Sequence, residues 1–384
     1  MTLNLLRVVR SLDPACGGPV EGIRQISPHL AALGVQTSVV TLDPPDVPWL
    51  ADQPFEVIPL GPVFGNYGYR PGLPKLIYDY AQQNDCVIVH DLWQYNAFAT
   101  WRALRGTGIP YYVYTHGMLD PWFKYNYPLK HLKKWAYWPW ANYRVLRDAS
   151  AVLFTTDQER LLARDSFWLY DVNECVVGYG TSSPPYEPDK QQQVFLDRFP
   201  DLRDKRIILF LSRIHPKKGV DLLIEAFARV YMLDSRLRLV IAGPDSVGWQ
   251  ASLQQQSISL GVDQFITWTG MLRDDLKWGS FRCAEVFCLP SHQENFGIVV
   301  AEALACGLPV AISHPVNISS EIAIAQSGIV FPDTLEGVYQ ALIRWLDLST
   351  QDKQVLSVNA YQLFHSRYDY KTIAAKLIPI LRGN

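Results

Sequence analysis

The chain has 384 residues, 48% of them hydrophobic and 19% charged, so it can bury large cores, and its length predicts two domains. Its 35 basic and 37 acidic residues exclude the basic excess that bulk nucleic-acid binding requires. Six scattered cysteines without a Cys-x-x-Cys pair predict free thiols rather than disulfides or a zinc site. No apolar run approaches the length of about eighteen residues that spans a membrane, and the start lacks signal-peptide features, so we expect a cytoplasmic protein.

Short β-rich runs alternate with helical patterns along the chain, which predicts parallel sheets with crossover helices. The predicted strands of the first half are 3–9, 37–42, 55–59, 87–90, 111–115, 151–154 and 174–177. Those of the second half are 206–211, 237–242, 264–269, 286–289, 310–313 and 328–331. A Pro- and Gln-rich stretch after residue 180 is typical of a linker. The sequence therefore predicts an α/β protein with Rossmann-like domains at 1–183 and 184–365, whose strand ends face a central cleft.

Small or ionisable residues follow several strands of the first half. Gly17 and Gly18 precede Pro19, which is typical of a helix start. Without side chains there, backbone amides can approach a phosphate or a sugar closely, although a plain tight turn is the alternative. His90 and His116 end two predicted strands, at the edge where ligands bind in such sheets. A lone histidine is more often structural, so both interpretations stay open for His90.

The segment 122–147 holds nine aromatic and six basic residues and no acidic residue. It could rest in the headgroup region of an anionic membrane and so bring the protein to a lipid-linked acceptor. Alternatively, the aromatic rings pack beneath the domain while the lysines reach water. A third interpretation is that the tryptophans stack on sugar rings.

Two cationic side chains, Arg213 and Lys218, lie in the loop between strand 206–211 and an amphipathic helix at 220–231. Both heads can converge on one anion, with arginine supplying a planar fork and lysine a point charge, the usual pair for a diphosphate. A solvated basic loop is the alternative for this segment alone.

Two carboxylates, Glu294 and Glu302, are eight residues apart after strand 286–289. We expect Glu294 in a loop and Glu302 about two turns into the helix that follows. Exposed amides at a helix start bind phosphate, and carboxylates accept hydrogen bonds from hydroxyls. Together with the cationic pair, this arrangement predicts a sugar-nucleotide site.

These motifs resemble those of a known family. Arg213-x4-Lys218 and Glu294-x7-Glu302, with Phe296-Gly297 between the glutamates, are similar to the signature of the retaining glycosyltransferases of family 4, also called group 1. That family has the GT-B fold of two Rossmann-like domains. Segments 17–19, 116–122 and 239–243 extend the likeness over essentially the whole chain.

The resemblance implies a role for each matching residue. Arg213 and Lys218 would hold the donor diphosphate and stabilise the departing nucleotide, Glu302 would bind the ribose, and Glu294 would contact hydroxyls of the transferred sugar. The catalytic set would be His116, Arg213, Lys218 and Glu294, with His116 against the donor sugar. The donor site would further include Gly17, Gly18, Gly270, Met271, Asn295 and the backbone amides of Phe296, Gly297 and Ile298. The resemblance also suggests that a last helix at about 366–384 packs back on the N-terminal domain. Apart from the resemblance, we expect acceptor contacts from His90, Trp122 and Lys124.

The expected function is transfer of a hexose-type sugar from a UDP-, GDP- or ADP-sugar to a saccharide or lipid-linked acceptor, in polysaccharide or glycoconjugate biosynthesis. No Asp-x-Asp occurs, so a metal that bridges the diphosphate has no obvious ligands, and we expect retention of configuration without metal or cofactor. Another GT-B enzyme, such as a sugar-nucleotide epimerase, is the alternative, since it would alter the donor without an acceptor. A carbohydrate-binding protein would not need the full arginine, lysine and paired-glutamate set.

Overall fold

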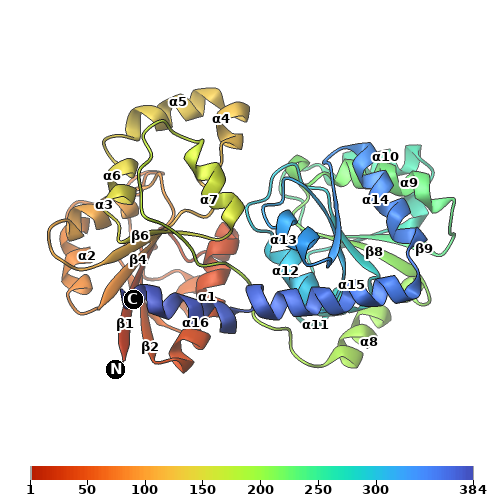
Figure 1. Cartoon of the computed structure of the whole chain (residues 1–384), viewed down its shortest axis with the longest axis horizontal. Coiled ribbons are helices and arrows are strands. Elements are labelled where there is room, and N and C mark those ends of the chain that lie inside the picture. Colours follow the sequence, from red (N-terminus) through yellow and green to blue (C-terminus); the bar gives the residue numbers. More distant parts are fainter. Residues whose placement is uncertain (1, 384) are drawn as a thin grey trace. The chain divides into compact units, whose positions relative to one another are not determined.

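A computed structural model describes residues 2–383, which fold into two compact units. Unit 1 comprises residues 2–182 and 370–383, and unit 2 comprises residues 183–369 (Figure 1). The chain enters unit 2 at Ser183 and leaves it at Asp369, and the Ser183 hydroxyl donates a hydrogen bond of 3.2 Å to the Asp369 carboxylate. The two crossing points of the chain are thus tied to each other.

Unit 1 contains a seven-stranded parallel sheet with the order β3-β2-β1-β4-β5-β6-β7. The strands are β1 (Leu3–Val9), β2 (Val35–Thr41), β3 (Glu56–Pro59), β4 (Cys86–His90), β5 (Tyr111–Tyr114), β6 (Ala151–Phe154) and β7 (Glu174–Val176). The helices are α1 (Gly18–Ala32), α2 (Leu73–Ala81), α3 (Tyr95–Leu104), α4 (Trp122–Asn126), α5 (Pro128–Tyr137), α6 (Asn142–Arg147), α7 (Asp157–Arg164) and α16 (Tyr370–Leu381).

Helices cover both faces of this sheet, as expected where parallel strands are buried on both sides. On one face α16 lies beside α1 (Figure 1), and Leu30 and Leu377 share an apolar core with Leu5 of β1. On the other face α2, α3 and α6 contribute Ile77, Trp101 and Leu146 to a larger core.

Unit 2 contains a six-stranded parallel sheet with the order β10-β9-β8-β11-β12-β13. The strands are β8 (Arg206–Leu211), β9 (Leu237–Ala242), β10 (Ile266–Gly270), β11 (Val286–Leu289), β12 (Val310–Ser313) and β13 (Gly328–Phe331). The helices are α8 (Pro188–Arg198), α9 (Val220–Tyr231), α10 (Gln250–Ser259), α11 (Asp274–Cys283), α12 (Ile298–Ala305), α13 (Ser319–Ile324), α14 (Leu335–Asp347) and α15 (Thr350–Leu363). Strand β10 begins two residues later than predicted because Asp263–Phe265 forms a 3-10 turn.

Each sheet has one place where the strand order reverses direction, which is where ligands bind in open α/β sheets. In unit 1 this switch point lies between β1 and β4, and in unit 2 it lies between β8 and β11. The predicted α/β fold class with two Rossmann-like domains is confirmed.

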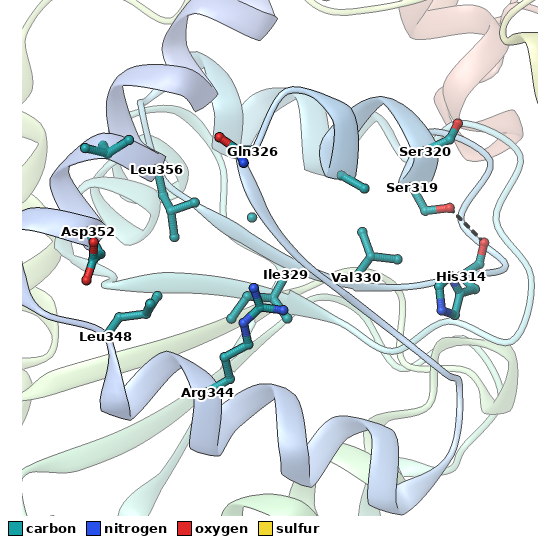
Figure 2. Close-up of a pocket in the computed structure, with 13 residues that line it drawn as sticks. His314, Ser319, Ser320, Gln326, Ile329, Val330, Arg344, Leu348, Asp352 and Leu356 are labelled. Atoms are coloured by element: carbon teal, nitrogen blue, oxygen red, sulfur yellow. Dashed lines mark hydrogen bonds between the residues drawn. The ribbon is translucent and has the colours of Figure 1, made fainter.

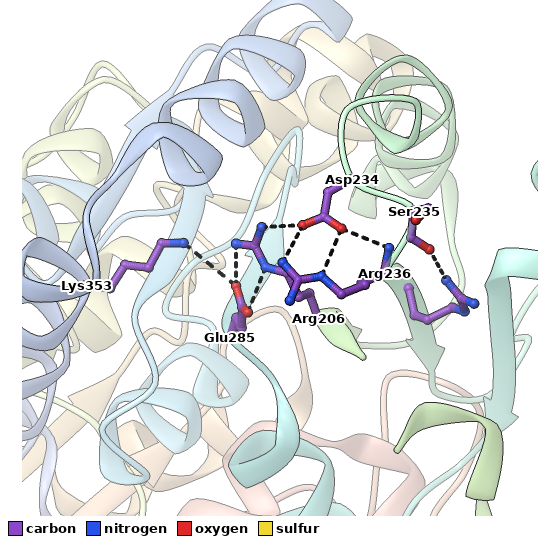
Figure 3. A network of polar contacts seen from close by, with 7 residues as sticks. Arg206, Asp234, Ser235, Arg236, Glu285 and Lys353 are labelled. Atoms are coloured by element: carbon purple, nitrogen blue, oxygen red, sulfur yellow. Dashed lines mark hydrogen bonds and ion pairs between the residues drawn. The ribbon is translucent and has the colours of Figure 1, made fainter. Parts of the chain in front are cut away.

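A polar network ties together the amino-terminal ends of three strands of unit 2, opposite the edge where ligands bind (Figure 3). The Arg206 guanidinium donates two hydrogen bonds of 2.9 Å to Glu285 and one of 2.9 Å to Asp234. Hydrogen bonds from Arg236 and then Arg206 hold the pKa of Asp234 well below its usual range. These ion pairs therefore fasten β8, β9 and β11 away from the predicted site.

Candidate sugar-nucleotide site

The loops after β8 and β11 meet at the switch point of unit 2. Gly219 has φ 64°, and a Cβ atom there would lie 2.2 Å from the carbonyl oxygen of Pro290. The backbone amide of His292 donates to the carbonyl of Lys217 at 2.8 Å. Only glycine permits both this conformation and this close approach, so residue 219 brings the basic loop against the acidic one.

The structure brings Lys218 and Glu294 together as an ion pair between these loops. Both side chains are largely shielded, with exposed fractions of 12% and 20%. Beside them, the Lys217 ammonium donates to the side-chain oxygen of Gln293 at 3.2 Å. Arg213 is exposed in the same loop, and no hydrogen bond or ion pair within residues 2–383 holds its guanidinium. Lys218 is therefore already paired, and Arg213 remains available to an anion.

Helix α12 begins at Ile298, directly after Gly297, which has φ 77° and caps the helix. Phe296 is buried and packs edge-on against Tyr368, with ring centroids 5.5 Å apart. The preceding residue, Asn295, accepts a hydrogen bond of 3.3 Å from the Asn317 side chain. The start of α12 lies against Glu294, since a Cβ atom added at Gly297 would be 3.2 Å from Cγ of Glu294, and a phosphate or sugar cradle requires such a helix start.

Glu302 lies one turn into α12 rather than the two turns expected, because the helix begins only at Ile298. The residue is 5% exposed, and the Lys277 ammonium of α11 contacts its carboxylate at 2.8 Å. Lys277 leaves no signal in the sequence. The lysine therefore orients the Glu302 carboxylate, and contact of this carboxylate with a ribose stays a prediction.

The loop after β10 reaches the same edge of the sheet. Gly270 has φ 68°, and its carbonyl accepts a hydrogen bond of 2.8 Å from the amide of Gly243, which follows β9. Met271 is 59% exposed, whereas Leu272 is buried. The loop is therefore fixed on both sides of Met271. Its accessible apolar side chain suits contact with the flat face of a nucleobase.

In unit 1 the predicted glycine turn follows β1 at the switch point. Gly17 has φ 79° and caps α1, which begins at Gly18, and no atom lies within 4 Å of a Cβ added at Gly17. The left-handed backbone favours glycine there although the surrounding space is open. The Gly17 amide donates to the carbonyl of Pro14 at 3.0 Å and Pro19 has no N–H, so contact of this turn with a phosphate or sugar stays a prediction.

His90 is 2% exposed, which speaks against the direct acceptor contact that was expected of it. Its Nε2 lies 2.9 Å from Nη1 of Arg7, and its Nδ1 lies 2.9 Å from Nε2 of His116. Both ring nitrogens are therefore occupied within unit 1. Burial, Arg7 and His116 hold the pKa of His90 well below its usual range.

His116 is partly exposed at the end of β5, and its backbone has φ 47°, in the left-handed region that non-glycine residues rarely adopt. A buried carboxylate, Glu159 of α7, holds this loop by accepting hydrogen bonds from Thr115 at 2.7 Å and from the amide of Gly117 at 2.6 Å. Burial and Arg7 lower the pKa of His116 to about 3, so the ring is neutral at physiological pH. Such retained backbone strain is typical of functional positions.

A further carboxylate, Asp91, follows His90 and was not found from the sequence. Its backbone has φ 73°, and no hydrogen bond or ion pair of its carboxylate occurs within residues 2–383. Burial raises its pKa to about 6. A shielded carboxylate without a partner at a strand end indicates a ligand contact more than a structural role.

The aromatic and basic segment divides into a buried and an exposed part. Trp138 is fully buried, and its ring stacks on Phe167 with centroids 4.2 Å apart. No residue of α5 is buried, and Leu129 and Leu132 are 79% and 64% exposed. Large apolar residues that share this exposure are Tyr125, Trp135, Trp140 and Trp168. Within residues 2–383, no helix has the length and apolarity needed to cross a bilayer.

The residues expected to contact an acceptor lie in this region. Trp122 is partly exposed at the start of α4 and packs edge-on against Phe123, with centroids 5.4 Å apart. The exposed Lys124 lies over the ring of Tyr125, 5.8 Å from its centroid. Neither side chain belongs to the buried core, so both are accessible to a ligand.

Unit 2 also contains an open pocket of about 650 Å³ that none of the predicted site residues lines (Figure 2). His314 and Ser319 lie at one end, where the Ser319 hydroxyl donates to the His314 carbonyl at 3.0 Å, and Arg344 and Asp352 extend from α14 and α15. The pocket runs along the edge strand β13 rather than along the switch point.

The comparisons with known proteins agree with this geometry. Residues 17–180 match the model of the glycosyl transferase 4-like domain, and residues 194–363 match the model of glycosyl transferases group 1. Together the two matches cover the strand ends described above in both units. The chain belongs to the group 1 glycosyltransferases of the family 4 type.

Similar curated proteins include two D-inositol 3-phosphate glycosyltransferases. That of Geodermatophilus obscurus is 33% identical over 37% of this chain and 33% of its own length. That of Kribbella flavida is 32% identical over 49% of this chain and 46% of its own length. The chain thus spans a third to a half of the length of these relatives.

Solved structures of GT-B glycosyltransferases resemble the whole chain. Sucrose-phosphate synthase of Thermosynechococcus elongatus has a TM-score of 0.76 at 19% identity, over 99% of this chain and 98% of its own. HepE of Anabaena, solved in complex with UDP and glucose, has a TM-score of 0.75 at 18% identity, over 100% of both chains. At this identity the likeness establishes the GT-B fold alone.

Proposed function

We propose that the protein transfers a hexose-type sugar from a nucleoside diphosphate sugar to a saccharide or lipid-linked acceptor, with retention of configuration. The observation that carries this proposal is the ion pair of Lys218 and Glu294 at the switch point of unit 2, with Arg213 exposed in the same loop as Lys218. Cations and helix amides suit a diphosphate, and carboxylates suit sugar hydroxyls. HepE, a relative in fold, was solved with UDP and glucose, which favours a uridine donor for the first experiment.

The departing diphosphate gains negative charge as the glycosidic bond breaks, so the reaction needs positive charge near the leaving oxygens. Lys218, Arg213 and the amides at the start of α12 supply that charge in our proposal, and no metal is required. Glu294 contacts hydroxyls away from the reacting carbon. The leaving phosphate oxygen then takes the acceptor proton on the same face, which retains the configuration.

The experiment is a reaction of the full chain with UDP-, GDP- and ADP-sugars and candidate acceptors, with and without EDTA. We expect an acceptor-dependent product that keeps the anomeric configuration of the donor, measured by NMR of the anomeric proton, and equal yield with chelator. An inverted product contradicts the retaining reaction, and loss of activity in EDTA contradicts metal independence. An altered nucleotide sugar formed without any acceptor would favour the epimerase alternative.

We also propose that α4 and α5 contact an anionic membrane surface, at the cytoplasmic face, and so present a lipid-linked acceptor to unit 1. Exposed Leu129, Leu132 and Trp135 supply apolar contacts, and the surrounding lysines complement anionic headgroups. Vesicles with and without anionic lipid test this surface in a flotation assay. We expect Leu129→Ser with Leu132→Ser to abolish binding to anionic vesicles, whereas Leu233→Ser, at an exposed leucine of unit 2, leaves it intact. Equal binding to neutral vesicles would contradict the proposal.

A further inference from the structure

Three side chains from neighbouring strands of unit 1 form a continuous hydrogen-bonded line. Arg7 of β1 contacts His90 of β4 at 2.9 Å, and His90 contacts His116, directly after β5, at 2.9 Å. The two imidazole rings are nearly parallel, with an interplanar angle of 15°. Arg7 and His90 are each 2% exposed, so the line runs from the core of unit 1 to the partly exposed ring of His116.

The chemistry of the first residue sets the direction of every hydrogen bond in this line. A guanidinium only donates, so Nε2 of His90 must accept from Arg7. A neutral imidazole carries one N–H, which in His90 is then at Nδ1 and is donated to Nε2 of His116. The remaining N–H of a neutral His116 is therefore at its own Nδ1. Burial and Arg7 keep the pKa of both rings low, which agrees with two neutral imidazoles.

We infer that Arg7 and His90 are positioning residues that fix His116 as the neutral Nδ1–H tautomer. The ring then offers a hydrogen-bond donor, and not a base, to an oxygen of the reacting sugars. The tautomer follows from the contacts in unit 1 alone, whereas its use on a sugar rests on the proposed function.

The burial of Arg7 is hard to explain by stability. Its Nε and Nη2 have no hydrogen-bond partner among residues 2–383, and the groups that face it are His90 and the neutral side chains of Tyr114, Tyr179, Tyr370 and Cys86. A buried charge without a counter-ion is costly, and an apolar side chain of similar volume is often better tolerated. What arginine supplies here, and an apolar residue does not, is an obligatory donor to His90.

Contacts of the backbone and of the ring keep the His116 side chain in this line of hydrogen bonds. Its left-handed backbone is held by the hydrogen bonds that Glu159 accepts from Thr115 and from the amide of Gly117. The ring also stacks on Tyr114, with centroids 5.3 Å apart. The orientation and the tautomer are therefore fixed by separate sets of contacts.

Two-bond proton–nitrogen NMR of the full chain labelled with ¹⁵N-histidine tests the tautomer without any substrate. The signals are assigned from the His116→Asn and His90→Gln variants. We expect both rings as neutral Nδ1–H tautomers from pH 6 to 8. In Arg7→Met, His116 should become a mixture of tautomers, and Arg7→Lys, which keeps a buried donor, should restore the single form. The Nε2–H tautomer or an imidazolium at His116 in the unaltered protein would overturn the inference, as would an unchanged tautomer in Arg7→Met.

Kinetics then separate the inference from the proposed function. Loss of a fixed donor should lower kcat about tenfold in Arg7→Met, since the contribution of one hydrogen bond is of that size. The affinity for the free nucleotide should stay unchanged, and Arg7→Lys should recover most of the lost rate. If Arg7→Met changes the tautomer but not kcat, the line of hydrogen bonds stands, and the role of His116 in the proposed reaction is overturned.

Discussion

Lys218 and Glu294 are ion-paired to each other across the loops that follow β8 and β11. The same two residues are proposed to bind opposite ends of the sugar diphosphate. Binding of the donor then exchanges the Glu294 contact of Lys218 for a phosphate contact and frees the carboxylate for sugar hydroxyls. The pair keeps both partly shielded charges compensated until the substrate arrives.

The exchange predicts different outcomes for the two halves of the pair. Lys218→Ala should weaken nucleotide binding and turnover by about ten- to a hundredfold, since a charge-assisted contact contributes about 1.5–3 kcal/mol. Isothermal titration with UDP, GDP and ADP and steady-state kinetics measure both. Lys217→Ala is the matched control because that ammonium contacts Gln293 instead and should have a much smaller effect. Equal losses in both variants would contradict the assignment of Lys218.

Glu294→Gln should leave the affinity for a free nucleotide equal or somewhat higher, because Lys218 loses its competing partner. The affinity for the nucleotide sugar should fall, because an amide has only one acceptor for the sugar hydroxyls. Titrations with UDP and UDP-sugar in parallel give the ratio directly. Weaker binding of the free nucleotide would place Glu294 on the wrong part of the ligand.

Glu302→Gln should instead lower the affinities for the free nucleotide and for the nucleotide sugar by the same factor, about tenfold, since both ligands carry the ribose. The variant also leaves Lys277 without its carboxylate, so a fall in melting temperature is expected as well. Lys277→Met separates the two effects, because it keeps the ribose acceptor but removes its orienting contact. A change in sugar-donor affinity alone would contradict the ribose role.

Replacing Asp91 with asparagine should stabilise the protein by an amount that depends on pH. Its pKa is raised to about 6 in the folded state by burial, so folding favours the protonated acid, and stability is lost as the pH rises from about 4 through 6. Asp91→Asn removes that loss, so its melting temperature should exceed that of the unaltered protein by an amount that grows over this window and then stays constant. The gain should be about 1–3 kcal/mol, allowing for partial exposure.

Thermal melts between pH 4 and 8 measure this difference. Asp46→Asn, at an exposed aspartate, serves as the control and should show no such growth. A melting temperature of Asp91→Asn at or below that of the unaltered protein at pH 8 would mean that the carboxylate has a stabilising partner.

The sequence predicted the strand ends well because apolar β-branched runs followed by glycine or polar residues identify them locally. Arg213 and Lys218 lie in the loop after β8, and Glu294 and Glu302 lie in the loop and the helix after β11. Lys277 escaped prediction because its partner lies on another helix, and helix-to-helix side-chain contacts leave no local pattern. Arg7 did leave a signal, a charge within the buried strand 3–9, but its partner His90 lies on a strand more than eighty residues away.

Glu159 was missed for a different reason. Thr156 and Glu159 have the spacing of a helix capping box, and the Thr156 hydroxyl does accept from the Glu159 amide at 2.9 Å. The sequence therefore explained Glu159 as part of a helix cap, and no further role was needed. Only the fold shows that the same carboxylate also holds the loop of His116.

The position of α16 has a consequence for how the protein is made. One face of the first sheet is completed by residues that leave the ribosome only after all of unit 2. Until then Leu5, Tyr112 and Tyr114 lack the part of their cover that α16 supplies, although every strand around them has long been synthesised. Unit 2 can close on itself as soon as Ser183 and Asp369 meet. The second half of the chain therefore matures first, and a stop codon anywhere before residue 370 damages the first.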